Sequence, residues 1–313
     1  MAGADPRTLD PTPPDISVVI GVRNAIDSLE TTLASLFSHQ GVSLEVVVVD
    51  DGSSDGTLAL LQQLAAREPR LRPLAQPPRG LTAALIHGCA AARGRYLARQ
   101  DAGDRSLPGR LAKQLACLEA NPEASLCSTH ARCTVEQDIT LEIRAVPQER
   151  LQDGLTGPAF HGSVLMRRSA YIQVGGYRPM FYYAQDLDLW SRLVEQGPHL
   201  VVPEVLYQAG IAAGSISGSR RREQERYRRL IVAATDARRH DRSERPWLRR
   251  AERLAEHCRR STAPHARRLA EGNYFIGSCL MSSHPDLARR YLQTCLEHNP
   301  LHWRARLKLA RLP

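Results

Sequence analysis

Hydrophobic and polar positions alternate along the first 120 residues in a strand and helix rhythm. Short apolar runs predict buried strands at residues 16–22, 44–49 and 95–99. Leucine-rich faces at helical spacing predict helices at residues 27–38, 58–66 and 81–92, and one from Pro108, as its first residue, to about Glu119. This order is typical of an α/β fold in which a mainly parallel sheet carries helices on both faces.

After residue 120 the pattern is first weakly strand-like and then helical. We expect a helix at residues 186–195, a strand at 201–207 and a mobile loop at 210–219. Residues 273–312 are expected to form two packed helices that join at Asn299-Pro300. The chain therefore divides into a disordered N-terminus (1–14), an α/β domain (15–219) and an α-helical C-terminal region (220–313).

Composition fits a soluble globular protein, with 42% hydrophobic and 24% charged residues. No apolar run approaches the ~20 residues that span a bilayer, and residues 1–14 lack the pattern of a secretory signal. The seven cysteines are scattered and form no C-x-x-C pair, which favours a reducing, cytoplasmic compartment and argues against a zinc site.

Positive charge is concentrated in the C-terminal third. From Arg220 onward there are 23 Lys or Arg and 10 Asp or Glu, whereas the whole chain has a net charge of +9. A solvated helical bundle with Arg on its outer face is the favoured interpretation. The alternative is peripheral contact with the anionic inner face of a membrane. No motif accompanies the charge that would indicate nucleic-acid binding.

Carboxylates follow two of the predicted strands, Asp50-Asp51 the second and Asp101 to Asp104 the third. Ligands of parallel α/β sheets bind beyond the carboxyl ends of the strands. Neither loop contains a G-x-x-x-x-G-K or G-x-G-x-x-G motif, so phosphates would be held by a metal bridging to Asp or by basic side chains. Each acidic stretch taken alone also fits an ordinary turn.

Five blocks taken in order resemble glycosyltransferase family 2, whose members have the GT-A fold. They are ISVVIGVRNAIDSLETTLASLFSHQ, LEVVVVDDGSSDGT, GRYLARQDAGDRSLPGRLAKQ, HGSVLMRRSAYIQVGGYR and AQDLDLWSRL. The resemblance covers roughly residues 16–217, and the VVVDDGSSDGT block is its most specific part. Beyond about Arg220 there is no family resemblance.

The resemblance implies a nucleotide site at the strand ends. Val22 and Arg23 would lie against the base, and Asp50 or Asp51 would hydrogen-bond it, with uracil as the expected base. Asp101 would lie at the ribose and the diphosphate.

A divalent cation, Mn²⁺ or Mg²⁺, would neutralise the diphosphate leaving group. The family's D-x-D motif would place a second metal-binding carboxylate at position 103, where this chain has Gly103. Asp101 and the neighbouring Asp104 are therefore the expected metal ligands.

The resemblance assigns catalysis to Asp186, as the general base that deprotonates an acceptor hydroxyl during a single inverting displacement. Gln185 takes the Glu position of the family's E-D motif. His161, Gly175 and Gly176 match positions near the acceptor and the donor sugar, although His161 alone fits a core role equally well.

A second departure from the family concerns residues 210–213, where many relatives carry an Arg and a His that can meet the diphosphate. The hypothesis for this chain is that the basic triplet Arg220 to Arg222 replaces them. The expected function is an inverting, metal-dependent glycosyltransferase that uses a UDP-sugar and a glycan or lipid-linked acceptor in cell-surface glycan synthesis. The rivals are a degenerate relative that binds nucleotide or glycan without turnover, and a nucleotidyltransferase.

Overall fold

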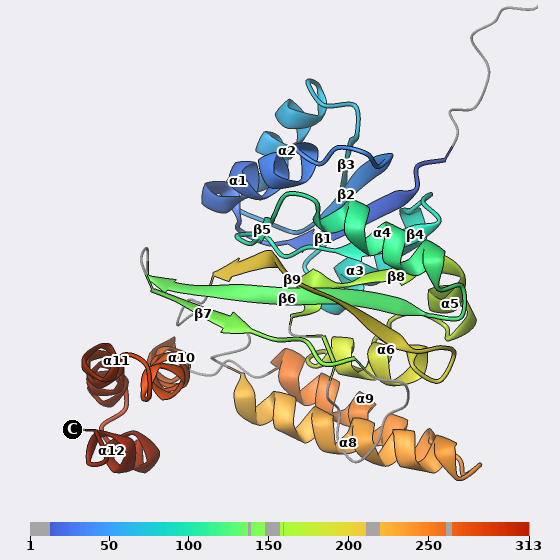
Figure 1. Cartoon of the computed structure of the whole chain (residues 1–313). Coiled ribbons are helices and arrows are strands. Elements are labelled where there is room, and N and C mark those ends of the chain that lie inside the picture. The colour runs from blue at the N-terminus through green and yellow to red at the C-terminus, as the bar shows by residue number, and fades with distance from the viewer. Residues whose placement is uncertain are drawn as a thin grey trace, which may run out of the picture.

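The computed structural model describes residues 13–136, 139–147, 157–158, 160–210, 220–260 and 265–312. A single mixed sheet lies at the centre of the α/β part of the chain. The strand order is β3-β2-β1-β4-β8-β6-β9-β5, and β7 pairs with β6 at the side of this path (Figure 1). The strands are β1 (Ile16–Val22), β2 (Leu44–Asp51), β3 (Leu71–Gln76), β4 (Tyr96–Arg99), β5 (Arg105–Ser106), β6 (Leu126–Glu136), β7 (Ile139–Ile143), β8 (Leu165–Arg167) and β9 (His199–Gly210).

The first four strands in space are parallel, because β1 pairs in parallel with both β2 and β4, and β2 with β3. The register places Val22 beside Asp50, so the carboxyl ends of β1 and β2 meet at one edge. β6 and β9 are also parallel, whereas β4–β8, β6–β8, β6–β7 and β5–β9 are antiparallel. The predicted mainly parallel α/β sheet is confirmed.

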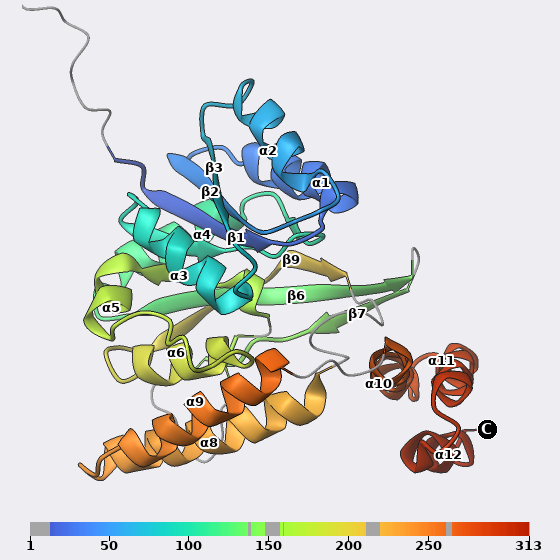
Figure 2. The same cartoon turned by 180° about the vertical axis from the view of Figure 1, so that it is seen from behind.

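Helices cover both faces, as predicted (Figures 1 and 2). One face carries α1 (Ile26–Phe37), α2 (Thr57–Ala65) and α4 (Arg110–Ala120), whose leucines pack on the apolar side chains of β1 and β2. The other face carries α3 (Leu81–Ala91), α5 (Arg168–Gln173) and α6 (Gln185–Leu193). The single-turn helix η1 (His161–Ser163) leads into β8.

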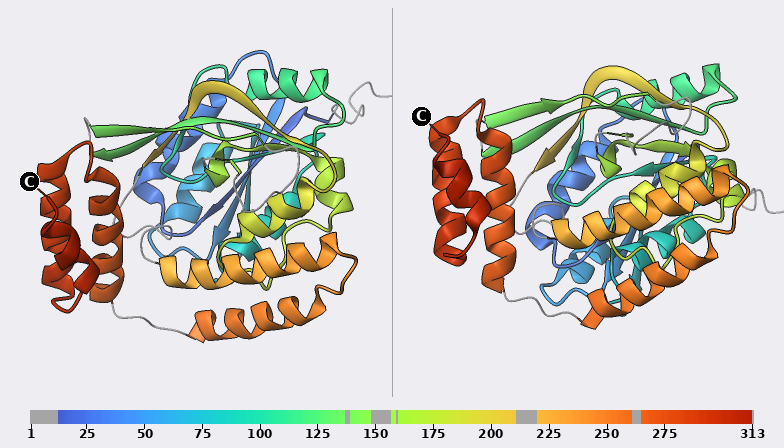
Figure 3. Two further views of the ribbon diagram at one scale, coloured as in Figure 1. Left: turned by 60° about the horizontal axis from the view of Figure 1, so that its bottom comes forward. Right: turned by 90° about the horizontal axis from the view of Figure 1, so that it is seen from below.

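The C-terminal helices form two groups (Figure 3). α8 (Arg221–Arg239) and α9 (Arg245–Arg260) pack on the segment that precedes α6, where Phe181, Tyr183, Tyr227, Ile231 and Leu254 share one apolar cluster. α10 (His265–Leu280), α11 (Pro285–His298) and α12 (Trp303–Leu309) form the second group, next to β6 and β7. Contacts therefore cross the predicted domain boundary at residue 220, which itself stays a prediction.

Three local expectations were wrong. The helix predicted from Pro108 begins at Arg110, because Gly109 has a positive φ of 81° and cannot belong to it. Strand β3 was not predicted, since its sequence LRPLAQ contains a proline; β3 is at the end of the sheet order, where a strand tolerates proline. The 273–312 stretch forms three helices, because α10 ends at Leu280, ahead of the predicted junction.

Two predictions fall largely on residues that the structure does not describe. The disordered N-terminus (1–14) lies outside the described residues except for its last two positions, and the mobile loop predicted at 210–219 is described only at Gly210. Among the helices of the described ranges, none combines the length with the apolar character that crossing a membrane requires.

Candidate functional site

The loops after β1 and β2 are hydrogen-bonded into one unit at the carboxyl edge of the sheet. Asn24 lies in the left-handed region (φ 53°); its N–H donates to Ser53 Oγ at 2.8 Å and its Oδ1 accepts from Ser54 N at 2.9 Å. Asp55 and Thr57 accept the first N–H groups of the α1 segment. The DDGSSDGT block thus caps α1 from outside and fixes the position of the exposed Arg23.

Asp50 and Asp51 are both buried, and they have different partners. Asp51 accepts from Gln76 Nε2 at 2.7 Å and from the N–H groups of Arg79 and Gly80, both at 2.8 Å, so it holds the loop between β3 and α3. Asp50 accepts from Ser53 N at 3.1 Å, and its Oδ1 is buried with no hydrogen-bond partner among the described residues. Both stay candidates for base recognition, because each carboxylate retains acceptor capacity.

Asp101 follows β4 and is paired with a buried arginine. Arg99 is 1% exposed and Asp101 37% exposed, and the Arg99 guanidinium donates to Asp101 Oδ1. The same guanidinium donates to the carbonyl of Val19 at 2.8 Å, and Arg99 Nε donates to His161 Nε2 at 3.4 Å. Asp101 Oδ2 has no partner among the described residues. Sequence reasoning missed Arg99, because an arginine at a strand end ordinarily reaches solvent.

Asp104 is held inside the site. Its Oδ2 accepts from the Tyr207 hydroxyl at 2.7 Å and its Oδ1 from Gly210 N at 3.1 Å. Burial, together with the charge of Asp101, raises the pKa of Asp104 to about 7. Gly103 has a φ of 90°, a left-handed conformation that favours glycine, and its N–H donates to Thr32 Oγ1 at 2.9 Å. Gly103, which stands where the family resemblance expects a carboxylate, therefore has a backbone conformation that disfavours any residue with a side chain.

A second buried arginine, Arg110, was also missed. It donates to the carbonyls of Arg99 at 2.9 Å and Gly162 at 2.7 Å, and to Gln100 Oε1 at 2.9 Å. Its guanidinium lies 5.0 Å from the centre of the Tyr207 ring. Arg110 thus ties α4 to the strand end that carries Asp101.

His161 is part of the site, and its side chain is half-buried. Its Nε2 lies 2.6 Å from the Tyr177 hydroxyl, and its ring packs edge-on against Trp190, with 6.1 Å between the ring centres. Burial and then the charge of Arg99 lower the pKa of His161 well below its usual value, so the ring is neutral. Because Arg99 Nε can only donate, Nε2 is the acceptor and the proton lies on Nδ1.

Gly175 and Gly176 end α5 with positive φ values of 77° and 64°. The N–H of Gly176 donates to the carbonyl of Tyr171 at 2.8 Å, and a Cβ at Gly176 would lie 2.7 Å from the Tyr171 ring. The two glycines therefore set the position of Tyr177, and through its hydroxyl that of His161.

Asp186 occupies the first turn of α6 and is half-buried. Ala184, the residue before the helix, has a φ of 56°, which is strained for a residue with a Cβ and is a common mark of functional sites. Burial raises the pKa of Asp186, and the charge of Asp101 adds to this effect whereas that of Arg99 opposes it. Gln185 is buried directly beside it.

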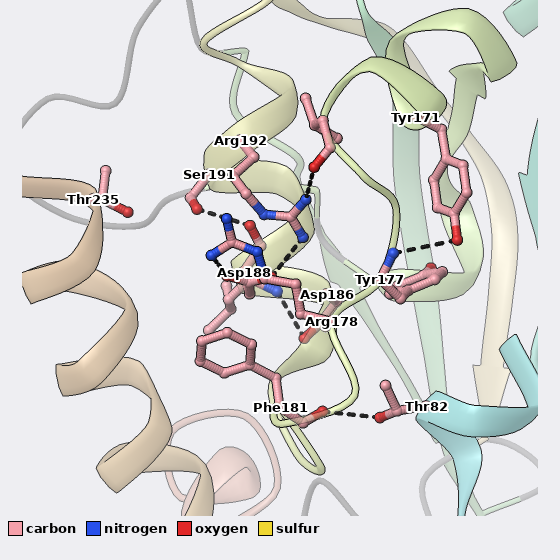
Figure 4. A network of polar contacts seen from close by, with 12 residues as sticks. Thr82, Tyr171, Tyr177, Arg178, Phe181, Asp186, Asp188, Ser191, Arg192 and Thr235 are labelled. Atoms are coloured by element: carbon pink, nitrogen blue, oxygen red, sulfur yellow. Dashed lines mark hydrogen bonds and ion pairs between the residues drawn. The ribbon is translucent and has the colours of Figure 1, made fainter. Parts of the chain in front are cut away.

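A chain of buried and partly buried ion pairs joins the remainder of α6 to the C-terminal helices, and Figure 4 shows the part of it around Asp188. Asp188 accepts from Arg192 at 2.5 Å and lies 3.6 Å from Arg178. Arg178 also pairs with Glu244 at 2.7 Å, and Glu244 pairs with Arg238 at 2.6 Å. Part of the C-terminal arginine excess therefore holds the helix that carries Asp186.

The basic triplet does not act as one unit. Arg221 lies over Phe275 at 5.9 Å and Arg222 pairs with Glu271 at 3.5 Å, so both contact α10. Arg220 lies over the Tyr183 ring at 5.8 Å, three residues before Asp186. Of the three arginines, Arg220 is therefore the one whose contact residue, Tyr183, lies nearest in sequence to Asp186, the predicted catalytic residue.

The fold matches the GT-A class in solved structures. The structure of S. aureus TarS 1-349 in complex with UDP-GlcNAc covers 95% of this chain and 88% of its own, with a TM-score of 0.57 and 15% identity. The mannosyltransferase PcManGT from Pyrobaculum calidifontis, in complex with GDP-Man and Mn²⁺, covers 95% of this chain and 87% of its own, with a TM-score of 0.56 and 19% identity. At these identities the likeness concerns the fold.

Sequence comparison supplies the family. The family model "Glycosyl transferase family 2" matches residues 17–175, slightly more than half of the chain. The putative glycosyltransferase EpsE of Bacillus subtilis is 34% identical over 190 residues, which are 59% of this chain and 68% of EpsE. The succinoglycan biosynthesis protein ExoO of Rhizobium meliloti is 32% identical over 184 residues, 56% of this chain and half of ExoO. The chain belongs to glycosyl transferase family 2.

Proposed function

We propose that the chain is an inverting glycosyltransferase that transfers a sugar from a UDP-sugar to a hydroxyl acceptor, with Asp186 as general base. The observation that carries the proposal is the position of Asp186, half-buried at the start of α6 beside a strained Ala184 and within the fields of Asp101 and Arg99. A raised pKa makes a carboxylate a better proton acceptor once it is ionised. One such base suffices for a single displacement with inversion.

The donor would lie along the carboxyl edge of β1, β2 and β4. Arg23, together with the backbone around Val22, would contact the base, and the unpaired oxygen of Asp50 or the remaining lone pair of Asp51 would accept from it. Asp101 would face the ribose and diphosphate. Support for a UDP-sugar comes from the UDP-GlcNAc complex of TarS, whose fold this chain shares.

The residues at the end of β4 fit a metal that the donor helps to bind. Asp101 is half-buried and keeps Oδ2 without a protein partner among the described residues, whereas both oxygens of Asp104 are engaged. Mg²⁺ or Mn²⁺ is commonly held by one or two carboxylates plus substrate phosphates. Asp101 would be the principal ligand and Asp104 the second, and a bound ion would neutralise charge on the leaving diphosphate.

The other residues have positioning roles in this proposal. His161, neutral and fixed through Nε2 by Tyr177 and Arg99, would donate a hydrogen bond from Nδ1 to the acceptor or donor sugar, and Gln185 would lie beside the base. A glycan or lipid-linked acceptor in cell-surface glycan synthesis is supported by similarity to ExoO, whose name places it in succinoglycan biosynthesis. The proposed site of action is cytoplasmic, at the inner face of the membrane.

The alternative is a relative that binds nucleotide or glycan without turnover, and Gly103 is the observation that favours it. Donor hydrolysis with UDP-, GDP- and dTDP-sugars, with and without Mn²⁺, separates the two. We expect metal-stimulated hydrolysis of a UDP-sugar that Asp186→Asn abolishes without loss of UDP binding. Binding without any hydrolysis or transfer would favour the degenerate relative, and full activity of Asp186→Asn would remove the base assignment.

A further inference from the structure

An exposed apolar surface lies on the last helix of the described chain, α12, and on the turn just before it. Leu301 is 86% exposed, Trp303 65% and Leu307 46%. The first two are the most exposed large hydrophobic side chains among the described residues, and all three occur within seven positions. Large apolar groups gathered in this way mark an interaction surface more often than single exposed ones do.

The opposite face of α12 is already packed, so the exposed side chains are not an unfinished core. Ala305 is fully buried, and the ring of His302 lies 4.7 Å from that of Tyr274 while its Nδ1 accepts from Ala305 N at 3.1 Å. Leu309 and Leu312 pack on the α10–α11 cluster. The helix is thus anchored to α10 and α11 by one face and presents the other outward.

The charged side chains of the segment that carries this face are all positive. Residues 299–313 contain Arg304, Arg306, Lys308 and Arg311 and no acid; the nearest carboxylate along the chain is Glu297 on α11. The Arg304 guanidinium lies 5.3 Å from the centre of the Trp303 ring. Trp beside long cationic side chains suits the boundary between acyl chains and anionic headgroups, where the ring is partly buried and the cations meet phosphate.

We propose that a surface formed by α12 and the residues that flank it, namely Leu301, Trp303, Arg304, Leu307 and Arg311, binds an anionic membrane surface. A second copy of this chain is disfavoured, because a symmetric contact would oppose these cations without a carboxylate between them. The face lies in the α10–α12 group, which Figures 1 and 3 show at one end of the molecule, beyond β7. The inference stands on this surface and does not depend on the proposed transfer reaction.

The test is co-sedimentation of the full chain with vesicles of phosphatidylcholine alone and with about one-third phosphatidylglycerol. We expect binding to the anionic vesicles that weakens with salt. Arg304→Gln with Arg311→Gln should lower partitioning about thirtyfold. The matched control, Arg249→Gln with Arg253→Gln on α9, removes two exposed arginines elsewhere and should leave partitioning unchanged.

The apolar arm uses Leu301→Ser with Trp303→Ser, which should also lower partitioning, and Trp303→Phe, which should keep binding but remove the blue shift of tryptophan emission. Trp190 is buried and Trp247 lies on α9, so neither should supply that shift. UDP-sugar hydrolysis in solution should be equal in all variants, which separates this inference from the catalytic proposal.

Four outcomes would overturn the proposal. They are no binding of the wild-type chain to anionic vesicles, equal loss in the α9 control, a blue shift that persists in Trp303→Phe, and a dimer by light scattering that Leu301→Ser dissociates. Binding to a DNA duplex that depends on Arg304 and Arg311, with vesicle binding absent, would assign the face to nucleic acid instead.

Discussion

Gly103→Asp restores a carboxylate at the position where the family resemblance expects a metal ligand. A Cβ at residue 103 would meet no atom closer than Ser28 Cβ at 3.8 Å, so the new side chain has room. The cost comes from the backbone, whose φ of 90° disfavours any residue with a Cβ by about 1–2 kcal/mol. Replacing glycine also lowers the conformational entropy of the unfolded chain, which stabilises the folded state by about 0.4–1 kcal/mol. The net destabilisation is therefore about 1 kcal/mol.

The expected gain is in metal affinity. An added carboxylate beside Asp101 gives the ion a further hard oxygen ligand, and we expect Mn²⁺ to bind about tenfold tighter, or about 1.4 kcal/mol. Gly103→Ala is the matched control, since it carries the same backbone cost without the ligand. Stability is measured by urea unfolding, and Mn²⁺ affinity by calorimetric titration in the presence of UDP.

The two variants together separate the two parts of the argument. If Gly103→Asp binds Mn²⁺ no more tightly than Gly103→Ala, residue 103 does not face the ion and the alignment of the D-x-D motif with Asp101 is wrong. If neither variant loses stability, the backbone strain has been overestimated, and another reason must be found for the glycine.

Three further predictions concern the structure around the site. Glu244→Ala should destabilise the chain by about 1–2 kcal/mol in urea unfolding, because it removes one carboxylate partner from each of two partly buried arginines, while Arg178 keeps Asp188 and Arg238 keeps Glu195. Glu225→Ala, which breaks only exposed pairs on α8, should cost less than about 0.5 kcal/mol. Asp186→Asn should abolish transfer yet raise the thermal midpoint of unfolding at neutral pH, because burial raises the pKa of Asp186 in the folded state and the fold therefore disfavours its ionised form. The difference in midpoint between the variant and the wild type should vanish below pH 3.8, the ordinary pKa of the group. A variant that is less stable than the wild type at neutral pH would contradict this sign. Gly162→Ala should lower the free energy of unfolding by about 2–4 kcal/mol, because the new Cβ would lie 1.7 Å from the Tyr207 hydroxyl and would displace the Tyr207 ring from Asp104. Wild-type stability of this variant in thermal unfolding would show that the ring moves freely.

The strands and helices that carry the site were predictable because their patterns are local. The apolar runs of β1 and β2 follow from burial on both faces of the sheet, and the two strand ends with carboxylates follow from the α/β topology. The first helices were each placed to within a residue or two. Strand β3 was missed because its pattern is that of an edge strand with Pro73, which resembles a loop in sequence.

The partners of the acidic residues were not predictable, because they come from distant parts of the chain. Asp51 is bound by a loop 25 to 29 residues further along, and Asp104 by Tyr207, 103 residues away. Arg99 and Arg110 gave no signal of burial, since arginine is ordinarily a surface residue. The local hint was that Arg99 continues an otherwise apolar strand directly into the acidic loop.

The buried arginines explain how an acidic site stays assembled before any ligand arrives. The charge of Asp101 contributes to the raised pKa of both Asp104 and Asp186, because a nearby like charge disfavours the ionised form of a carboxylate. Arg99 opposes this effect at both Asp104 and Asp186, while Arg110 fixes the same strand end through backbone carbonyls. A buried guanidinium without a carboxylate partner would itself destabilise the fold, so the buried arginines and the carboxylates of the site stabilise one another. Of the two carboxylates at the end of β4, only Asp101 keeps an oxygen without a partner among the described residues, and the proposed donor diphosphate and its cation would be held at that point.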